Sequence, residues 1–244
     1  MCCGSSPESL INSIYPDIEE GHKTDDYFLN RTILSSCNDD VDDLNAMILE
    51  RFSGEEKTYW SSDKVILDGR EDSGEIQPYS SEYLASLKPS GLPLAKLTLK
   101  VGCPLMLLRN LNPALGLCNG TRMILVAMKS KVLECRILGG SYAGTKVFIP
   151  RISLKPSNDD LPIPLQRLQF PVRLAFAMTI NKSQGQSVKH VGLDLQTPVF
   201  SHGQLYVALS RCTSGDRVKV ILPSNQSENK TINIVYPEVF TNLL

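Results

Sequence analysis

The chain has 244 residues and a mass of 27.0 kDa, enough for one large domain or two small ones, each with a hydrophobic core. Its composition, 42% hydrophobic and 21% charged, is that of an ordinary soluble globular protein. No apolar run approaches the roughly 20 residues that a membrane helix needs, so we expect no contact with a membrane. The seven cysteines form no C-x-x-C pair and no Cys/His cluster at metal spacing, so we expect reduced thiols, no zinc and no other metal site.

The net charge of −1 conceals an uneven distribution of charge along the chain. Residues 1–100 carry 9 basic and 19 acidic side chains, whereas residues 101–244 carry 16 basic and 7 acidic ones. A basic C-terminal part suits contact with a polyanion such as nucleic acid. A dipolar surface without any function accounts for the same charges, and the composition leaves both explanations open.

The first part of the chain combines an acidic, polar start with one clear strand–helix unit. We interpret residues 1–27 as a connector that includes one short helix over residues 7–15. Residues 31–37 predict a short buried strand, and residues 38–50 predict a helix with Asn38 as its N-cap. A strand that leads into a helix is a unit of an α/β sheet.

The middle of the chain changes from irregular sequence to a series of short strands. Glycine, serine and proline recur in residues 53–95, which we interpret as a long irregular connection. Trp60 in this connection either anchors it or stacks on a base. Short apolar stretches separated by glycines then fill residues 96–154, and Asn119-Gly120 predicts a tight turn between two of them. Several short strands at this spacing predict a small β-barrel.

The α/β pattern returns after the predicted barrel. Residues 191–195 and 218–222 predict strands. Between them, residues 204–211 predict a helix that begins with a capping box from Ser201 to Gln204. We therefore expect an α/β domain with a parallel sheet, flanking helices and an inserted small barrel. The α/β domain is expected at residues 28–95 and 155–244, and the barrel at residues 96–154.

Polar side chains of several kinds follow one another between residues 179 and 187. A lysine, two hydroxyls and an amide precede Gly185, where the missing side chain lets a ligand approach the backbone closely. Lys182 adds a point charge, which suits a phosphate group. The same residue types also make an ordinary polar turn, and spacing alone favours the turn.

The predicted helix over residues 204–211 is amphipathic and ends at Arg211. Leu205, Ala208 and Leu209 share one of its faces. An arginine at the C-terminus of a helix is stabilised by the negative end of the helix dipole. It can also be an arginine finger, aimed at a phosphate across a domain cleft. Taken singly, the segment favours the former explanation.

Taken together and in this order, five segments resemble the C-terminal half of the petite-integration-frequency (PIF) family of DNA helicases, especially its Helitron transposon branch. The match covers nearly the whole chain. The Thr179–Gly185 and Tyr206–Arg211 blocks look like helicase motifs V and VI, and Asn181 is similar to the Helitron-type form, because many PIF-family members have histidine there. The residues that carry the resemblance are Arg31–Leu34 with Asn38, Val41 and Asn45, Leu99–Gly102 with Pro104–Leu111, Gly116–Arg122, Met178–Gly185, and Pro198–Arg211.

The resemblance implies a second RecA-like motor domain with a small inserted β-barrel. Such helicases hydrolyse ATP with Mg²⁺ between two RecA-like lobes and translocate 5′ to 3′ on single-stranded DNA. It implies roles in DNA repair, recombination, telomere maintenance or transposition, inside the cell and in the nucleus of a eukaryote, with mitochondria also open. By the same resemblance Arg211 is the catalytic arginine that reaches the γ-phosphate. The nucleotide contacts are expected at Gln184, Gly185 and Gln204, and the DNA contacts at Thr179, Asn181, Lys182 and Ser183.

One departure from the family is large. The chain has no G-x-x-x-x-G-K-[ST] motif, and no Asp-Glu pair follows an apolar strand, so the P-loop and the acidic Mg²⁺ site of the first motor lobe are absent from it. We expect ATP and Mg²⁺ to bind only with an N-terminal RecA-like lobe, which residues 1–27 would join, and the chain alone to be inactive. A fragment, a truncated gene model and a degenerate transposon remnant all remain open. The alternative functions are a stand-alone module that binds single-stranded DNA and an inactive relic.

Overall fold

The computed structural model describes residues 2–21, 23–66, 79–156, 163–223 and 230–239. The chain separates into two compact units. Residues 1–53 and 175–244 form the first, which we call the α/β unit, and residues 54–174 form the second, the β unit. The β unit is longer at both ends than the insert that we predict for residues 96–154. In the part of the chain that the structure describes, no helix is long and apolar enough to cross a membrane.

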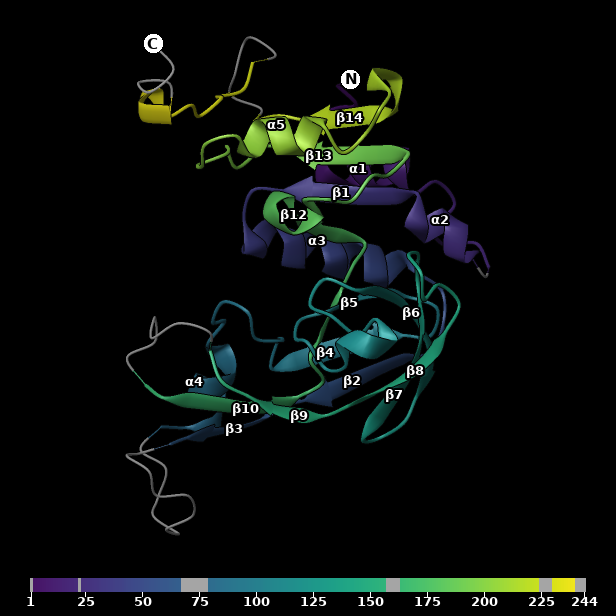
Figure 1. The fold of residues 1–244 in the computed structure, drawn as a ribbon, viewed down its shortest axis with the longest axis vertical. Helices are drawn as coiled ribbons and strands as arrows, with labels where there is room; N and C mark the ends of the chain where they lie inside the picture. The colour runs from purple at the N-terminus through teal and green to yellow at the C-terminus, as the bar shows by residue number, and fades with distance from the viewer. Residues whose placement is uncertain (1, 22, 67–78, 157–162, 224–229, 240–244) are drawn as a thin grey trace. The chain divides into compact units, whose positions relative to one another are not determined.

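The α/β unit is built on one parallel sheet of four strands (Figure 1). The strands lie in the order β12-β1-β13-β14, so the central β1 pairs on both sides, with Ile33 opposite Ala177 and Gly192. Nearly all their residues are buried, as expected for a parallel sheet covered on both faces. This confirms the predicted parallel α/β sheet. The strands are β12 (Ala177–Thr179), β1 (Arg31–Ser35), β13 (His190–Asp194) and β14 (Val218–Ile221).

Helices pack on this sheet. The helix α1 packs against β1, β13 and β14, whereas α3 packs against β1 and β12. In Figure 1, α1 is partly hidden behind β1 and β13. The α-helices are α1 (Pro7–Ile14), α2 (Asp25–Leu29), α3 (Asn38–Arg51) and α5 (Gln204–Leu209), and the 3-10 helices are η2 (Ile180–Ser183), η3 (Gly215–Arg217) and η4 (Pro237–Val239).

The helix α3 has the buried face that its sequence predicts. Val41, Leu44 and Ile48, spaced i, i+3 and i+7, are each at most 2% exposed. Its predicted cap is wrong, because the helix begins at Asn38 itself, and Cys37 is at the N-cap position, where no side-chain capping hydrogen bond is made. Asn38 therefore lies one residue too far into the helix to accept from its first free N–H groups.

The N-terminal segment is part of the core of the α/β unit, which differs from the connector that we predict for residues 1–27. Its helix α1 is capped by Ser6, whose hydroxyl accepts a hydrogen bond from the Ser9 N–H at 3.3 Å. Leu10 and Ile14 are at most 1% exposed and lie so close to Gly192 that a Cβ added there would meet Ile14 at 2.9 Å. The glycine therefore makes room for α1 on the sheet.

The described residues of the β unit form three antiparallel sheets. The largest has the order β11-β5-β6-β7-β8, and no pairing between described strands joins its edges β8 and β11, so the predicted small barrel is not confirmed. The other two sheets have the orders β3-β10-β9 and β2-β4. The elements are β2 (Glu56–Trp60), β3 (Ser62–Val65), α4 (Ser81–Ser86), β4 (Lys96–Lys100), β5 (Pro104–Leu107), η1 (Pro113–Leu115), β6 (Arg122–Met128), β7 (Val132–Ile137), β8 (Lys146–Pro150), β9 (Ile152–Leu154), β10 (Leu165–Gln169) and β11 (Val172–Leu174).

The long irregular connection that we predict for residues 53–95 is wrong in part, because this segment holds β2, β3 and α4. Both strands are short and rich in charged and polar side chains, so they lack the apolar pattern from which a strand is usually predicted. They pair with β4 and β10, which belong to distant parts of the chain.

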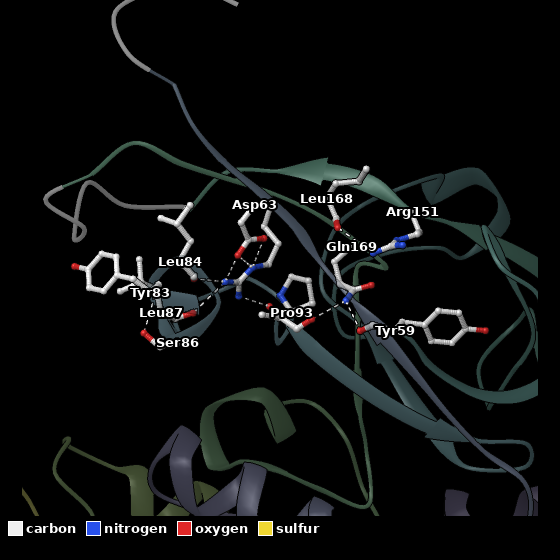
Figure 2. Close-up of polar contacts among 12 residues, drawn as sticks. Tyr59, Asp63, Tyr83, Leu84, Ser86, Leu87, Pro93, Arg151, Leu168 and Gln169 are labelled. Atoms are coloured by element: carbon white, nitrogen blue, oxygen red, sulfur yellow. Dashed lines mark hydrogen bonds and ion pairs between the residues drawn. The ribbon is translucent and has the colours of Figure 1, made fainter. Parts of the chain in front are cut away.

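A buried arginine holds these segments together (Figure 2). The side chain of Arg167 is 1% exposed and its Nη2 lies 2.7 Å from Asp63 Oδ2, whose side chain is 5% exposed. The same guanidinium donates to the carbonyl oxygens of Pro93, Leu84 and Leu87 at 3.0, 3.0 and 3.2 Å. Arg167 thereby joins β10, β3 and the end of α4.

Candidate functional site

The predicted phosphate-contacting segment forms the loop between β12 and β13. The chain leaves β12 at the half-buried Thr179 and makes the turn η2, in which Ser183 Oγ donates to the Ile180 carbonyl at 2.6 Å. Gly185 then has a φ of +79°, in the left-handed region that favours glycine. Four of the predicted site residues are exposed on this loop: Asn181, Lys182, Gln184 and Gly185.

The strand that leads into this loop is fixed by a buried asparagine. Asn45 in α3 is 2% exposed, and its side chain binds both backbone groups of Ala177. Asn45 Oδ1 accepts from the Ala177 N–H at 2.9 Å, and Asn45 Nδ2 donates to the Ala177 carbonyl at 3.1 Å. The start of the loop therefore has a defined position relative to α3.

Arg211 connects the two predicted helicase motifs. Just past the end of α5, its Nε donates to the Val207 carbonyl at 3.0 Å and its Nη2 to Ser210 Oγ at 2.9 Å. Its Nη1 reaches the β12–β13 loop and donates to the carbonyls of Gln186 and Ser183 at 2.9 and 3.4 Å. The half-buried arginine thus holds the loop against α5.

Gln204 lies at the other end of α5 and has an unused donor. It is 2% exposed, and its Oε1 accepts from the Phe200 N–H at 3.0 Å. Among the described residues, Gln204 Nε2 has no hydrogen-bond partner. The capping box that we predict from Ser201 to Gln204 is wrong, because Gly203 is the N-cap, no side chain caps the helix, and Gln204 is its first residue. A buried donor without a partner costs about 1–3 kcal/mol, so this position suits an acceptor from outside the chain.

A second group of polar residues, which sequence reasoning missed, lies where β1 and β13 end. Asp194 is 4% exposed, and burial raises the pKa of its carboxyl above the usual range, an effect that the N–H of Gln196 opposes and the charge of Asp40 increases. Asp40 accepts from Ser35 Oγ at 3.1 Å. Ligands of parallel α/β sheets bind at the carboxyl ends of the strands. The sequence signal for this group is Asp194, near the end of the strand predicted over residues 191–195.

These residues do not form a metal site by themselves. The described part of the chain contains no group of three or more His, Cys, Asp or Glu side chains arranged to hold a metal ion.

Among the predicted site residues, the structure brings Arg211 together with Ser183, and Arg211 also contacts Gln186. Gln204 lies at the opposite end of α5.

Comparison with known proteins agrees with this architecture. The family model described as "DNA helicase Pif1, 2B domain" matches residues 82–128. An ATP-dependent DNA helicase Pif1 from Bdellovibrio bacteriovorus is 28% identical over 222 residues, which cover 88% of this chain and 47% of the relative. The human ATP-dependent DNA helicase PIF1 is 35% identical over 146 residues, covering 58% of this chain and 22% of the relative.

Solved structures give the same answer for the fold. The crystal structure of Pif1 helicase from Candida albicans matches with a TM-score of 0.63 at 22% identity, over 100% of this chain and 56% of that one. Bacteroides Pif1 in complex with ADP-AlF3 and single-stranded DNA matches with a TM-score of 0.60 at 22% identity, over 98% and 49% of the two chains. These matches support similarity of the chain to the C-terminal portion of Pif1-family helicases.

The similar portion of these helicases is the C-terminal one, and the α/β unit has the RecA-like fold of the matched structures. The chain spans about half the length of the bacterial Pif1 helicase and about a fifth of the human one. The matched Pif1 2B region, residues 82–128, runs from α4 to the end of β6 and so lies wholly within the β unit.

Proposed function

We propose that this chain is the C-terminal motor lobe of an ATP-dependent 5′-to-3′ DNA helicase. In this proposal it binds single-stranded DNA and supplies Arg211 to ATP that an N-terminal RecA-like lobe holds. The relatives are named ATP-dependent DNA helicases, and one matched Bacteroides structure is a complex with ADP-AlF3 and single-stranded DNA. Because the chain spans about half of the bacterial relative, the activity of the whole protein is part of the proposal.

The observation that carries the proposal is the position of Arg211. Phosphoryl transfer spreads negative charge over the γ-phosphoryl oxygens, so a cation placed there stabilises the transition state. A guanidinium has five N–H donors, and the four hydrogen bonds that Arg211 makes with described residues leave one donor on Nη2. To bind a phosphate more fully, Arg211 has to exchange the loop carbonyls for phosphate oxygens. Nucleotide binding and the conformation of the loop are coupled in this way.

The nucleotide contacts proposed for this lobe are Gln184, Gly185 and Gln204. The unpartnered Nε2 of Gln204 supports this assignment, because it offers a buried donor to an acceptor atom. Gln184 and Gly185 are exposed on the loop that Arg211 holds. When bound with ATP, Mg²⁺ neutralises charge on the phosphates. The residues of this chain contribute hydrogen bonds and positive charge.

The DNA contacts are proposed on the same loop. Asn181 and Lys182 are exposed, which supports their contact with a strand, whereas Ser183 is buried and donates to its own turn. Thr179 is half-buried at the end of β12. Contacts of this kind hold the DNA backbone without reading its sequence. Asn181 is also the residue on which placement in the Helitron branch depends.

The test uses a two-lobed protein, in which this chain follows the N-terminal half of the Bdellovibrio relative. Arg211→Ala is expected to reduce DNA-stimulated ATP hydrolysis by about 10³-fold or more, the effect of losing an arginine finger. Arg217→Ala removes an exposed arginine from η3 and is the matched control, with turnover unchanged. Normal turnover in Arg211→Ala would rule out the arginine-finger role.

A second candidate function is a stand-alone module that binds single-stranded DNA. It is favoured by the uneven charge, with 16 basic and 7 acidic side chains in residues 101–244. For this candidate, the affinity of the chain alone falls linearly with salt concentration on a log–log plot, with a slope that reports several phosphate contacts. Binding that does not depend on salt, or no binding at low salt, contradicts it. An inactive relic shows neither DNA binding nor ATP hydrolysis in the two-lobed protein.

A further inference from the structure

The two-stranded sheet β2-β4 has one core face and one exposed face. Opposite residues of an antiparallel pair point to the same side, and successive residues alternate. Tyr59 pairs with Leu97, and both are at most 5% exposed, so this side faces the core of the β unit. On the other side, Trp60 pairs with Lys96, and Trp60 is 62% exposed. A tryptophan so exposed on a strand has most of its ring available to a partner.

The backbone around Trp60 is held from several sides, one of which is the contact of Gln169 with Tyr59 that Figure 2 shows. Gln169 is completely buried, and its Nε2 donates to the Tyr59 carbonyl at 3.0 Å. Arg151 Nη2 donates to the Trp60 carbonyl. The next residue, Ser61, donates through its N–H to the Ala95 carbonyl at 2.8 Å. The backbone that carries the exposed ring is therefore held in place. Binding of a ligand to the ring costs little conformational entropy as a result.

Polar and basic groups share the exposed face with the ring. Lys96 Nζ lies 5.8 Å from the centroid of the Trp60 ring, and Lys96 is itself exposed. Next along the ribbon, the hydroxyls of Thr58 and Thr98 are 3.0 Å apart. The only acidic side chain on this face of β2 and β4 is Glu56, at the far end of the ribbon. The end that carries Trp60 is therefore aromatic and positively charged.

We propose that Trp60 and Lys96 form a stacking platform for single-stranded DNA, with a base on the Trp60 ring and the adjoining phosphate at Lys96. This rests on the proposed function and adds a contact in the β unit, separate from the predicted loop of the α/β unit. Every base has a π-face, so the platform tolerates any sequence. The combination of one rigid aromatic ring with one lysine fits a nucleotide better than an apolar protein surface, which would need a wider apolar patch.

Trp60 is the only tryptophan in the chain, so its fluorescence reports directly on the platform. The probes are an oligothymidylate and an abasic oligonucleotide of the same length, titrated at low salt into the whole chain. Stacking predicts that the oligothymidylate quenches the fluorescence of Trp60 and binds more tightly than the abasic strand. The abasic strand has the phosphates without the bases and is expected to cause little quenching.

Variants separate stacking from charge. Trp60→Ala is expected to weaken binding of the oligothymidylate by about 5-fold or more and to abolish the preference over the abasic strand. Phe148→Ala removes an aromatic side chain that is equally exposed, at 61%, on β8 and serves as the matched control. Lys96→Gln is expected to lower the log–log salt slope by about 1. Circular dichroism and thermal melting of each variant verify that the fold is intact.

The outcomes distinguish the platform from the wider proposal. If the chain binds DNA while the fluorescence of Trp60 is unchanged and Trp60→Ala binds like the original, the platform is overturned and DNA binding elsewhere stands. A protein partner on this face would give that result. If the chain binds no single-stranded DNA at low salt, DNA binding by this lobe and the platform are overturned together.

Discussion

At the scale of single residues, the chain uses arginine in two different ways. Arg167 is buried and its bonds all go to groups of the β unit, so it fixes structure. Arg211 is half-buried and bonds mainly to backbone carbonyls of a loop and a short helix. Carbonyls are neutral partners that a phosphate can replace, whereas the carboxylate of Asp63 is a charged one. This difference is the physical reason for assigning function to Arg211 and structure to Arg167.

The structural role of Arg167 gives a prediction about stability. Arg167→Ala leaves the Asp63 carboxylate buried without its partner and is expected to lower the free energy of unfolding by about 3–5 kcal/mol. Lys146→Ala removes an ion pair with Glu134 in which the lysine side chain is 66% exposed, and about 0–1 kcal/mol is expected there. Urea denaturation of both variants measures the difference. Equal losses would contradict the special role of the buried pair.

The buried carboxyl of Asp194 gives a prediction about pH. Its pKa is raised in the folded chain, mainly by burial, so the folded state holds a proton that the unfolded state has lost. Stability is therefore lost as the pH rises from the ordinary range of an aspartate through the raised pKa. Asp194→Asn removes this loss and is expected to stabilise the chain more at pH 7 than at pH 3. Thermal melts at both pH values test it, and an equal effect at both would contradict the assignment.

At the scale of elements, the packing of α1 on the sheet makes the N-terminal segment part of the core of the α/β unit. Leu10 is fully buried between α1 and the sheet, so Leu10→Ala is expected to cost about 2–5 kcal/mol of unfolding free energy. Asn12→Ala changes an exposed position of the same helix and is the matched control, with a change within about 0.5 kcal/mol. A negligible effect of Leu10→Ala on the free energy of unfolding would contradict the packing of α1 in the core and would support the predicted connector.

Elements with a strong apolar pattern were the ones predictable from the sequence. The strands β1, β13 and β14 and the buried face of α3 follow from local residue order. The polar strands β2 and β3 were missed because their pairing depends on partners far along the chain. Arg167 and Asp63 are 104 residues apart, and no local signal connects them. Likewise, the sequence pointed to Arg211 and to the 179–187 loop one at a time, and only the fold brings them into contact.

At the scale of the whole molecule, the chain matches only part of the length of its relatives. It spans about half of the bacterial relative, and it contains no P-loop motif. Its charge is also unequally divided, with the basic excess in residues 101–244. These features fit a lobe that supplies cations and DNA contacts to a nucleotide held by a partner lobe. On this account neither lobe is sufficient for hydrolysis.

The most direct test of this account is the rate of ATP hydrolysis, with and without single-stranded DNA, for the chain alone and for the two-lobed protein. The account predicts no hydrolysis by the chain alone. It predicts DNA-stimulated hydrolysis by the two-lobed protein and its loss in Arg211→Ala. A two-lobed protein that is folded and binds ATP, yet hydrolyses it no faster when DNA is present, would contradict the account.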